Sequence, residues 1–387
     1  MRGIQIQNWA RATIGRVLLF LTLLAVGLPQ PGAAQAVRTN PGFAANSVPR
    51  NDDGSSDEVP IGFLVNFFGQ TFSTTYVNNN GNITFGDSLG TFTPAGLTGS
   101  PLRIIAPFWA DVDTRGEASS LVTYGLDTVG GRRAFGVNWV NVGYYNQHDD
   151  KHNSFQLVLI ERLDIGPGNF DIEFNYDRIE WETGDASGGR GGLGGTSASA
   201  GYSNGSGKPE DSFEILGSRI NGIFLDSNRR GLRYRRLNSD VRGRLVFFVR
   251  AGAVECTYGA LSIDDIFPWQ GGMGTVQVAA PFGCAWTAVS NSGFLTVTSS
   301  ATGSGNGTVE YEVAENRRPR PRAGTLTVAG ENIRVDQEAF VTLRVTPPAL
   351  QLSSVEGSFP NRIVFQIEPI EEEVEWAASA RLLNGEV

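Results

Sequence analysis

The sequence has few of the residue types on which much catalytic and metal chemistry depends. Its 387 residues include two cysteines and two histidines, which leaves little material for thiol catalysis or for a histidine-rich metal centre. Serine, histidine and aspartate do not occur in the order of a catalytic triad, and neither a zincin motif nor a phosphate-binding loop is present. We therefore predict that the protein is not an enzyme and has no cofactor, with calcium as the alternative weighed below.

Charged residues are also scarce. They make up 18% of the chain, and the net charge is −9. A chain of this sign has no general attraction to nucleic acid or to an anionic membrane surface, so we expect no nucleic-acid partner. After residue 36 no apolar run is long enough to cross a bilayer, which predicts no membrane span once the leader is removed.

The first 36 residues have the pattern of a secretory signal peptide. Three arginines precede an apolar run over residues 17–28, and Ala34 and Ala36 supply the small residues of a cleavage site. A membrane anchor is the alternative, but this run falls short of the roughly 20 residues that span a bilayer. We predict cleavage after Ala36 and a secreted, extracellular or cell-surface protein. In that oxidising environment Cys256 and Cys284 are expected to form a disulfide.

Glycine is abundant, with 49 residues, and short segments of alternating apolar and polar residues begin at residue 61. Glycine, asparagine and aspartate separate nearly all of these segments, and no helical period longer than two turns occurs. Asn80-Gly81 between two such segments predicts a type I′ hairpin turn. The pattern predicts an all-β chain that is long enough for two or three domains.

Residues 37–60 are polar and turn-rich without a hydrophobic period, which predicts a linker. Their acidic residues could form a calcium loop, but the alternation and the distal glutamate of an EF-hand are missing, so a solvated linker is favoured. The acidic residues are Asp52, Asp53, Asp57 and Glu58.

Residues 104–115, read as IIAPFWADVDTR, stand at the centre of the strand pattern. The alternation of a strand would place Asp111 and Asp113 on one face. Three interpretations are open: hydrogen bonding to turns and backbone, which we favour, a ligand pair for calcium or another divalent cation, and catalysis, which the spacing suits least. Both histidines lie in residues 148–152, where a metal site is weighed against an exposed polar loop, and the loop is favoured.

The order of motifs between residues 61 and 252 resembles the NIDO domain. The matching segments are residues 69–77, 80–83, 105–113, 153–159, 170–176, 179–181 and 200–203. In that family the module is extracellular and belongs to adhesive matrix and cell-surface proteins. The resemblance implies a β-sandwich domain over residues 61–252 and a non-enzymatic role in adhesion.

Residues 253–340 are similar to a BACON-type Ig-like domain. The similarity is carried by the two cysteines, Trp286, the glycine-rich segment 303–313 and the hairpin 322–330. It implies a second β-sandwich with a disulfide between Cys256 and Cys284, and a bacterial source. Residues 341–387 repeat the opening of this pattern, with Trp376 one domain length after Trp286, and are predicted to be a partial second repeat.

A basic run between two predicted strands of that domain could grip an anionic polysaccharide, although a solvated turn is favoured. It consists of Arg317, Arg318, Arg320 and Arg322. The sequence as a whole predicts an exported adhesion or extracellular-interaction protein with an extracellular protein or glycan as its partner. The alternative is binding of glycan or mucin carbohydrate through the BACON-type domain.

Overall fold

The computed structural model describes residues 35–340, 343–346 and 366–369. The predicted signal peptide, apart from its last two residues, lies outside them, as does most of the predicted repeat at 341–387. Within that repeat, β25 (Leu343–Thr346) pairs antiparallel with β26 (Gln366–Pro369). Among the described residues, none of the helices has the length and apolar character needed to cross a membrane.

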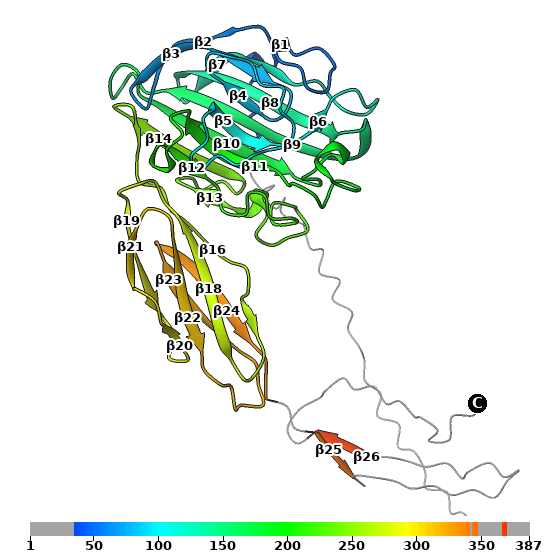
Figure 1. Cartoon of the computed structure of the whole chain (residues 1–387), viewed down its shortest axis with the longest axis vertical. Helices are drawn as coiled ribbons and strands as arrows, with labels where there is room; N and C mark the ends of the chain where they lie inside the picture. Colours follow the sequence, from blue (N-terminus) through cyan, green and yellow to red (C-terminus); the bar gives the residue numbers. More distant parts are fainter. Residues whose placement is uncertain (1–34, 341–342, 347–365, 370–387) are drawn as a thin grey trace, which may run out of the picture. The chain divides into compact units, whose positions relative to one another are not determined.

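The prediction of an all-β chain is confirmed (Figure 1). The larger of two N-terminal sheets has the strand order β1-β7-β8-β9-β10-β14-β13, with β6 beside β8 and β15 beside β14. Its strands are β1 (Asn46–Ser47), β6 (Val112–Asp113), β7 (Thr123–Val129), β8 (Arg132–Tyr144), β9 (His148–Glu161), β10 (Phe170–Arg178), β13 (Arg236–Leu237), β14 (Arg244–Arg250) and β15 (Ala253–Val254).

The smaller N-terminal sheet has the order β12-β11-β5-β4-β3-β2. Its strands are β2 (Val59–Phe67), β3 (Gln70–Asn78), β4 (Asn82–Thr84), β5 (Arg103–Trp109), β11 (Ser199–Asn204) and β12 (Ser212–Glu214). Four 3₁₀ turns also belong to this part of the chain: η1 (Pro41–Ala44), η2 (Asp185–Ser187), η3 (Pro209–Asp211) and η4 (Leu232–Tyr234).

The hydrophobic core lies between these two sheets. In β2 the alternating residues from Val59 to Phe67 are buried while those between them are largely exposed, as expected for a strand with one face on a core. Phe108 of β5 meets the ring of Phe155 in β9 at 5.2 Å and that of Trp181 at 5.7 Å. Trp139 stacks on Phe155 at 5.3 Å. The contact between Phe108 and Phe155 joins the two sheets into a sandwich around the central stretch of the sequence.

The prediction of a linker over residues 37–60 is wrong. Strand β1 pairs with β7, and Phe43 is fully buried on the outer face of the larger sheet. It fits there because β8 presents Gly136, where an added Cβ would lie 2.4 Å from the Phe43 ring. Single apolar anchors, rather than a hydrophobic period, attach this segment to the sheet.

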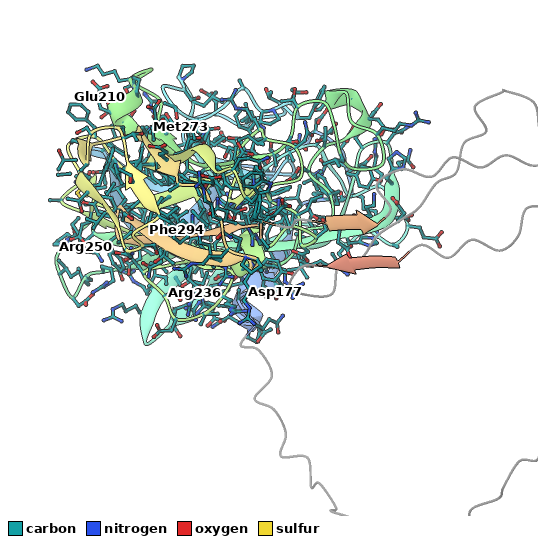
Figure 2. All side chains as sticks on the ribbon, turned by 90° about the horizontal axis from the view of Figure 1, so that it is seen from below. Asp177, Glu210, Arg236, Arg250, Met273 and Phe294 are labelled. Carbon is teal, nitrogen blue, oxygen red and sulfur yellow. A yellow bond between two sulfur atoms is a disulfide. The ribbon has the colours of Figure 1, made fainter. Side chains whose placement is uncertain are left out.

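The chain joins the fold at the predicted cleavage site. Ala36 is buried, its N–H donates to Asp177 (labelled in Figure 2) at 2.8 Å, and its carbonyl accepts from Arg244 at 2.6 Å. The N–H of Val37 also donates to Asp177, at 3.2 Å. Cleavage after Ala36 stays a prediction.

The C-terminal sheets form a second sandwich, here described by itself. One has the order β16-β18-β22-β20 and the other β17-β24-β23-β19-β21. Their strands are β16 (Gly259–Ser262), β17 (Ile266–Phe267), β18 (Gly272–Ala279), β19 (Ala285–Ser290), β20 (Leu295–Val297), β21 (Thr302–Ser304), β22 (Gly307–Val313), β23 (Arg322–Val328) and β24 (Glu331–Gln337). Trp286 and Tyr311 lie in its core, and the predicted disulfide joins Cys256 to Cys284, whose Cα atoms are 5.4 Å apart.

Candidate functional site

Three carboxylates from two distant segments meet beside the end of β5. Asp52 and Asp53 come from the segment before β2, and Asp111 lies two residues after the end of β5. One ligand oxygen from each of the three lies within 4.8 Å of the other two. The sequence singled out Asp111, but it paired that residue with Asp113 instead.

Asp111 is the most enclosed of the three. Its residue is 1% exposed, and neither carboxylate oxygen has a hydrogen-bond donor among the described residues. Its backbone is fixed, since Asp111 O accepts from Tyr145 N at 3.1 Å. Burial raises the pKa of Asp111 to about 7, and the negative charges of the neighbouring aspartates, Asp52 foremost, add to the rise. An ionised Asp111 therefore needs a positive partner.

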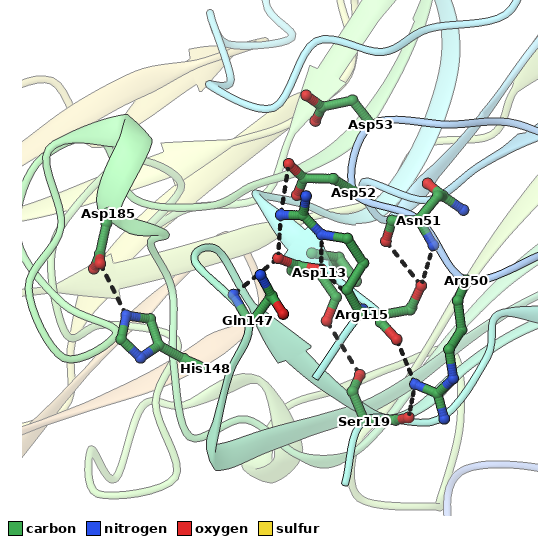
Figure 3. A network of polar contacts seen from close by, with 12 residues as sticks. Arg50, Asn51, Asp52, Asp53, Asp113, Arg115, Ser119, Gln147, His148 and Asp185 are labelled. Atoms are coloured by element: carbon green, nitrogen blue, oxygen red, sulfur yellow. Dashed lines mark hydrogen bonds and ion pairs between the residues drawn. The ribbon is translucent and has the colours of Figure 1, made fainter. Parts of the chain in front are cut away.

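Asp113 does not share that setting. Arg115 holds its carboxylate through Nε at 2.9 Å and Nη2 at 2.6 Å, and the backbone N–H groups of Arg115 and Gln147 each donate to it at 2.9 Å. Burial opposes ionisation, but these hydrogen bonds outweigh it, so the pKa of Asp113 is lowered. Asp113 belongs to a satisfied ion pair (Figure 3).

The predicted alternation of one strand, which would place Asp111 and Asp113 on one face, is wrong, whereas the alternative of a ligand pair for a cation stays a prediction. Strand β5 ends at Trp109 and β6 begins at Val112, so the strict alternation of a single strand does not run through the two aspartates. The Val112 N–H donates to Ala110 O at 2.9 Å and to Asn80 Oδ1 at 3.0 Å, a turn that separates the two side chains.

Arg115 also connects Asp113 with the acidic group. Its Nη2 lies 3.1 Å from Asp52 Oδ2, so one guanidinium serves two carboxylates (Figure 3). Asp52 Oδ1 is buried and receives no hydrogen bond within the described part of the chain. Burial, followed by the charges of Asp113 and Asp53, raises the pKa of Asp52 to about 6. The single arginine does not balance the charges gathered here.

Asparagines of the β3–β4 hairpin position the acidic segment. Asn79 Nδ2 donates to the carbonyls of Asp52 at 2.5 Å and Val112 at 2.6 Å, and Asn80 Nδ2 donates to Asp53 Oδ1 at 2.9 Å. Both asparagines are fully buried. The hairpin was predicted, but these roles were not, because asparagine next to glycine was interpreted as turn chemistry alone.

Glycines complete the walls of the site. A Cβ at Gly184 would lie 2.4 Å from Asp111 Oδ2, and a Cβ at Gly81 would lie 1.8 Å from Phe108 O. In the hairpin Gly81 has a positive φ of 73°, whereas Asn79 and Asn80 do not. A type I′ turn needs two positive φ angles, so the hairpin does not form the predicted type I′ turn. The turn that forms instead directs the asparagine side chains into the protein interior.

The two histidines lie in β9 rather than in the predicted loop. His148 Nε2 is 2.8 Å from Asp185 Oδ2, and its ring stacks on Tyr144 at 4.7 Å. The backbone N–H of His152 donates to Glu180. In the described structure neither histidine belongs to the acidic group formed by Asp52, Asp53 and Asp111.

The predicted basic run extends from the segment after β22 to the first residue of β23, and some of its arginines make contacts within the fold. Arg322 stacks over Phe294 (labelled in Figure 2) at 4.0 Å and donates to Gln337 at 2.8 Å. Arg317 pairs with Glu315 at 2.7 Å, and Arg318 and Arg320 are exposed. The role of the four arginines in ligand binding stays a prediction.

The acidic group offers carboxylate oxygens, without a nitrogen or sulfur ligand. Such an arrangement has two chemical outcomes at neutral pH: a carboxyl takes up a proton, or the group binds a cation. Oxygen ligands alone suit hard cations such as calcium and magnesium.

Comparison with known proteins agrees with the two-part organisation. The family model described as NIDO related matches residues 35–224, and the model of the viral BACON domain matches residues 268–346. Mouse α-tectorin is 37% identical over 55% of this chain and 10% of its own length. Nidogen from Drosophila melanogaster is 28% identical over 25% of this chain and 9% of its own length. The chain thus spans about a tenth of these relatives.

Solved structures add little to this. A Bacteroides ovatus GH5 xyloglucanase in complex with a XXXG heptasaccharide is 20% identical over 21% of this chain and 19% of its own, with a TM-score of 0.19, and that likeness supports no argument about function. The family models therefore identify residues 35–224 as similar to the NIDO-related family and residues 268–346 as similar to the BACON domain.

Proposed function

We propose that this protein is a non-enzymatic extracellular interaction protein whose NIDO-like sandwich binds another extracellular protein. The observation that carries the proposal is the match of residues 35–224 to the NIDO-related family, together with 37% identity to α-tectorin. Modules of the NIDO family belong to adhesive matrix and cell-surface proteins. Because the chain spans only a tenth of these relatives, their individual partners are not transferred to it.

A hollow on the NIDO-like sandwich offers a surface for such a contact. It lies between the β2–β3 hairpin and the turn after β9, and Leu64 and Leu163 line it with 52% and 58% of their area exposed. Arg133 and Glu161 form an ion pair on the same lining, at 2.5 Å. Exposed apolar side chains beside a charged pair are typical of surfaces that contact other proteins.

The test is binding of the purified secreted chain to a panel of extracellular-matrix proteins and to a glycan array. We expect saturable binding to a matrix protein that weakens at least tenfold in the Leu64→Ser/Leu163→Ser variant. Val289→Ser is the matched control, since Val289 is also exposed (55%) but belongs to the C-terminal sandwich. Binding to no matrix protein, or equal weakening by both variants, contradicts the proposal.

Carbohydrate binding through the BACON-type part is the second candidate. It is supported by Phe282, a residue that is 78% exposed in the turn between β18 and β19, because exposed aromatic rings can stack on sugars. Retention on the glycan array that is lost in Phe282→Ala but kept in the leucine double variant would favour this candidate over protein binding. A bacterial source stays a prediction.

A further inference from the structure

We propose that Asp52, Asp53 and Asp111 bind a divalent cation of the size and charge of calcium. The inference goes beyond the proposed interaction function and does not depend on it. It rests on the geometry of the three carboxylates, on the unsatisfied state of the most buried one, and on the residues that hold them in place.

The geometry suits one shared ion. Oxygens that each lie about 2.3–2.6 Å from one calcium ion are at most about 5 Å apart. One carboxylate oxygen from each of the three aspartates lies within 4.8 Å of the other two. A single ion at their centre can therefore touch all three without a rearrangement of the backbone.

The buried carboxylate provides independent evidence for a ligand. Asp111 is 1% exposed, and the described structure supplies no hydrogen-bond donor to either of its oxygens. Burying an unpaired polar group is costly, and a protonated carboxyl would still leave its O–H without an acceptor. A cation in contact with Asp52 and Asp53 removes this cost.

Among the described residues no side chain takes that role. Arg115 reaches Asp52 Oδ2 through Nη2, but this nitrogen and Nε both donate to Asp113. Asp52 Oδ1 and Asn79 Oδ1 are also buried without a donor in the described residues. Carboxylate oxygens, with amide or carbonyl oxygens and water completing the shell, are typical calcium ligands.

The surrounding structure holds the ligands in place without a metal. Asn80 orients Asp53, Asn79 ties the Asp52 backbone to Val112, and the N–H of Asn51 donates to Thr114 Oγ1 at 3.0 Å. The ion would join the segment before β2 to the β5–β6 turn. It would act as a clamp between two parts of the chain that are far apart in sequence.

The set of ligands favours calcium over its competitors. Magnesium requires near-ideal octahedral geometry and short bonds, whereas calcium accepts irregular sets of six to eight oxygens. Zinc prefers nitrogen and sulfur ligands, and the acidic group offers neither. Extracellular calcium modules bind with dissociation constants of about 10⁻⁴–10⁻³ M, the range that we expect here.

The test uses the whole secreted chain, stripped with EDTA, dialysed and titrated calorimetrically with calcium chloride or magnesium chloride at pH 7.5. We expect one calcium site per chain, at least tenfold weaker binding of magnesium, and a rise in Tm of roughly 2–9 °C in 5 mM calcium. Asp53→Asn and Asp111→Asn should each weaken calcium binding at least tenfold. Asp53 is exposed, so its variant tests the site without disturbing the core.

Asp57→Asn is the matched control, because Asp57 is an exposed aspartate of the same segment outside the acidic group. It should bind calcium as the unmodified chain does. The proposal is overturned if the unmodified chain shows no calcium binding and no shift in Tm up to 10 mM calcium. It is also overturned if Asp53→Asn and Asp111→Asn bind as tightly as Asp57→Asn. Magnesium binding as tight as calcium would overturn the assignment to a calcium-sized ion.

Discussion

Gly184 lies against the carboxylate of Asp111, so closely that a Cβ at this position would be 2.4 Å from Asp111 Oδ2. Its φ of −86° is one that any residue adopts, so the demand for glycine here is spatial and not conformational. Gly184, directly before η2, therefore forms one wall of the acidic site.

Gly184→Ala should push the Asp111 carboxylate out of position. We expect a loss of about 1–3 kcal/mol in the free energy of unfolding, as in other overpacked interiors, together with at least tenfold weaker calcium binding. Urea unfolding and calorimetry measure the two effects. Gly293→Ala is the control, since nothing lies within 4 Å of a Cβ there. If Gly184→Ala changed neither the free energy of unfolding nor the calcium affinity, position 184 would not hold the Asp111 carboxylate rigidly in place.

Asp111→Asn should stabilise the protein when calcium is removed. The pKa of Asp111 is raised to about 7, so between pH 4 and 7 the folded state binds a proton that the unfolded state has released. Stability in EDTA should therefore fall as pH rises through this window, by up to about 1.4 kcal/mol per pH unit. The variant lacks this ionisation and should show a shallower fall.

Neighbouring ionisable groups also contribute to the dependence of stability on pH. Asp52, with its pKa raised to about 6, contributes in the same direction, whereas Asp113, with a lowered pKa, gains stability as pH rises near 4. The other titratable or charged groups near the site in the described structure are Asp53, Asp185, Arg115 and His148. Urea midpoints in EDTA from pH 4.5 to 8 should differ between the variant and the unmodified chain most above pH 7. Equal slopes would contradict the assigned pKa of Asp111.

Arg115→Ala should be strongly destabilising, because it leaves the buried carboxylate of Asp113 without its bidentate partner. Breaking one side of a buried pair costs about 3–5 kcal/mol, and the partial exposure of Arg115 (38% of its side chain) places the expectation at the lower end. Arg317→Ala removes an arginine that is 81% exposed in its pair with Glu315, and it should cost less than about 1 kcal/mol. Urea unfolding measures both free energies of unfolding. Similar losses of stability in Arg115→Ala and Arg317→Ala would contradict this expected difference.

The disulfide between Cys256 and Cys284 should stabilise the C-terminal sandwich. It closes a loop with a sequence separation of 28, for which the chain-entropy argument gives about 3–4 kcal/mol. The Cys256→Ser/Cys284→Ser variant should unfold at a lower urea concentration than the unmodified chain and should not respond to dithiothreitol. A dithiothreitol effect of equal size in the variant would show that the reagent acts elsewhere.

The sequence predicted those features that depend on local pattern or on short motifs. The all-β class followed from alternation, and the disulfide followed from having two cysteines in a chain predicted to be exported. Asp111 was identified because a carboxylate after an apolar strand is conspicuous. These properties belong to single segments, which a sequence shows directly.

The composition of the site depended on contacts between segments. Asp52 and Asp53 reach Asp111 because Asn79 and Asn80 hold their segment against the β5–β6 turn, and no local pattern indicates this. The ligand-pair alternative grouped Asp113 with Asp111, and the sequence did not indicate that Arg115, two residues away, folds back onto Asp113. Residues 37–60 were predicted to be a linker because the sequence alone does not show where Phe43 packs. Phe43 fits a space beside Gly136, which lies in a distant strand.

The most direct test of the cation site is a crystal structure of the full secreted chain grown in 5 mM calcium, with anomalous diffraction data. The account predicts one calcium peak about 2.3–2.6 Å from oxygens of Asp52, Asp53 and Asp111. Ordered water alone at this position, or calcium bound only elsewhere, would contradict it.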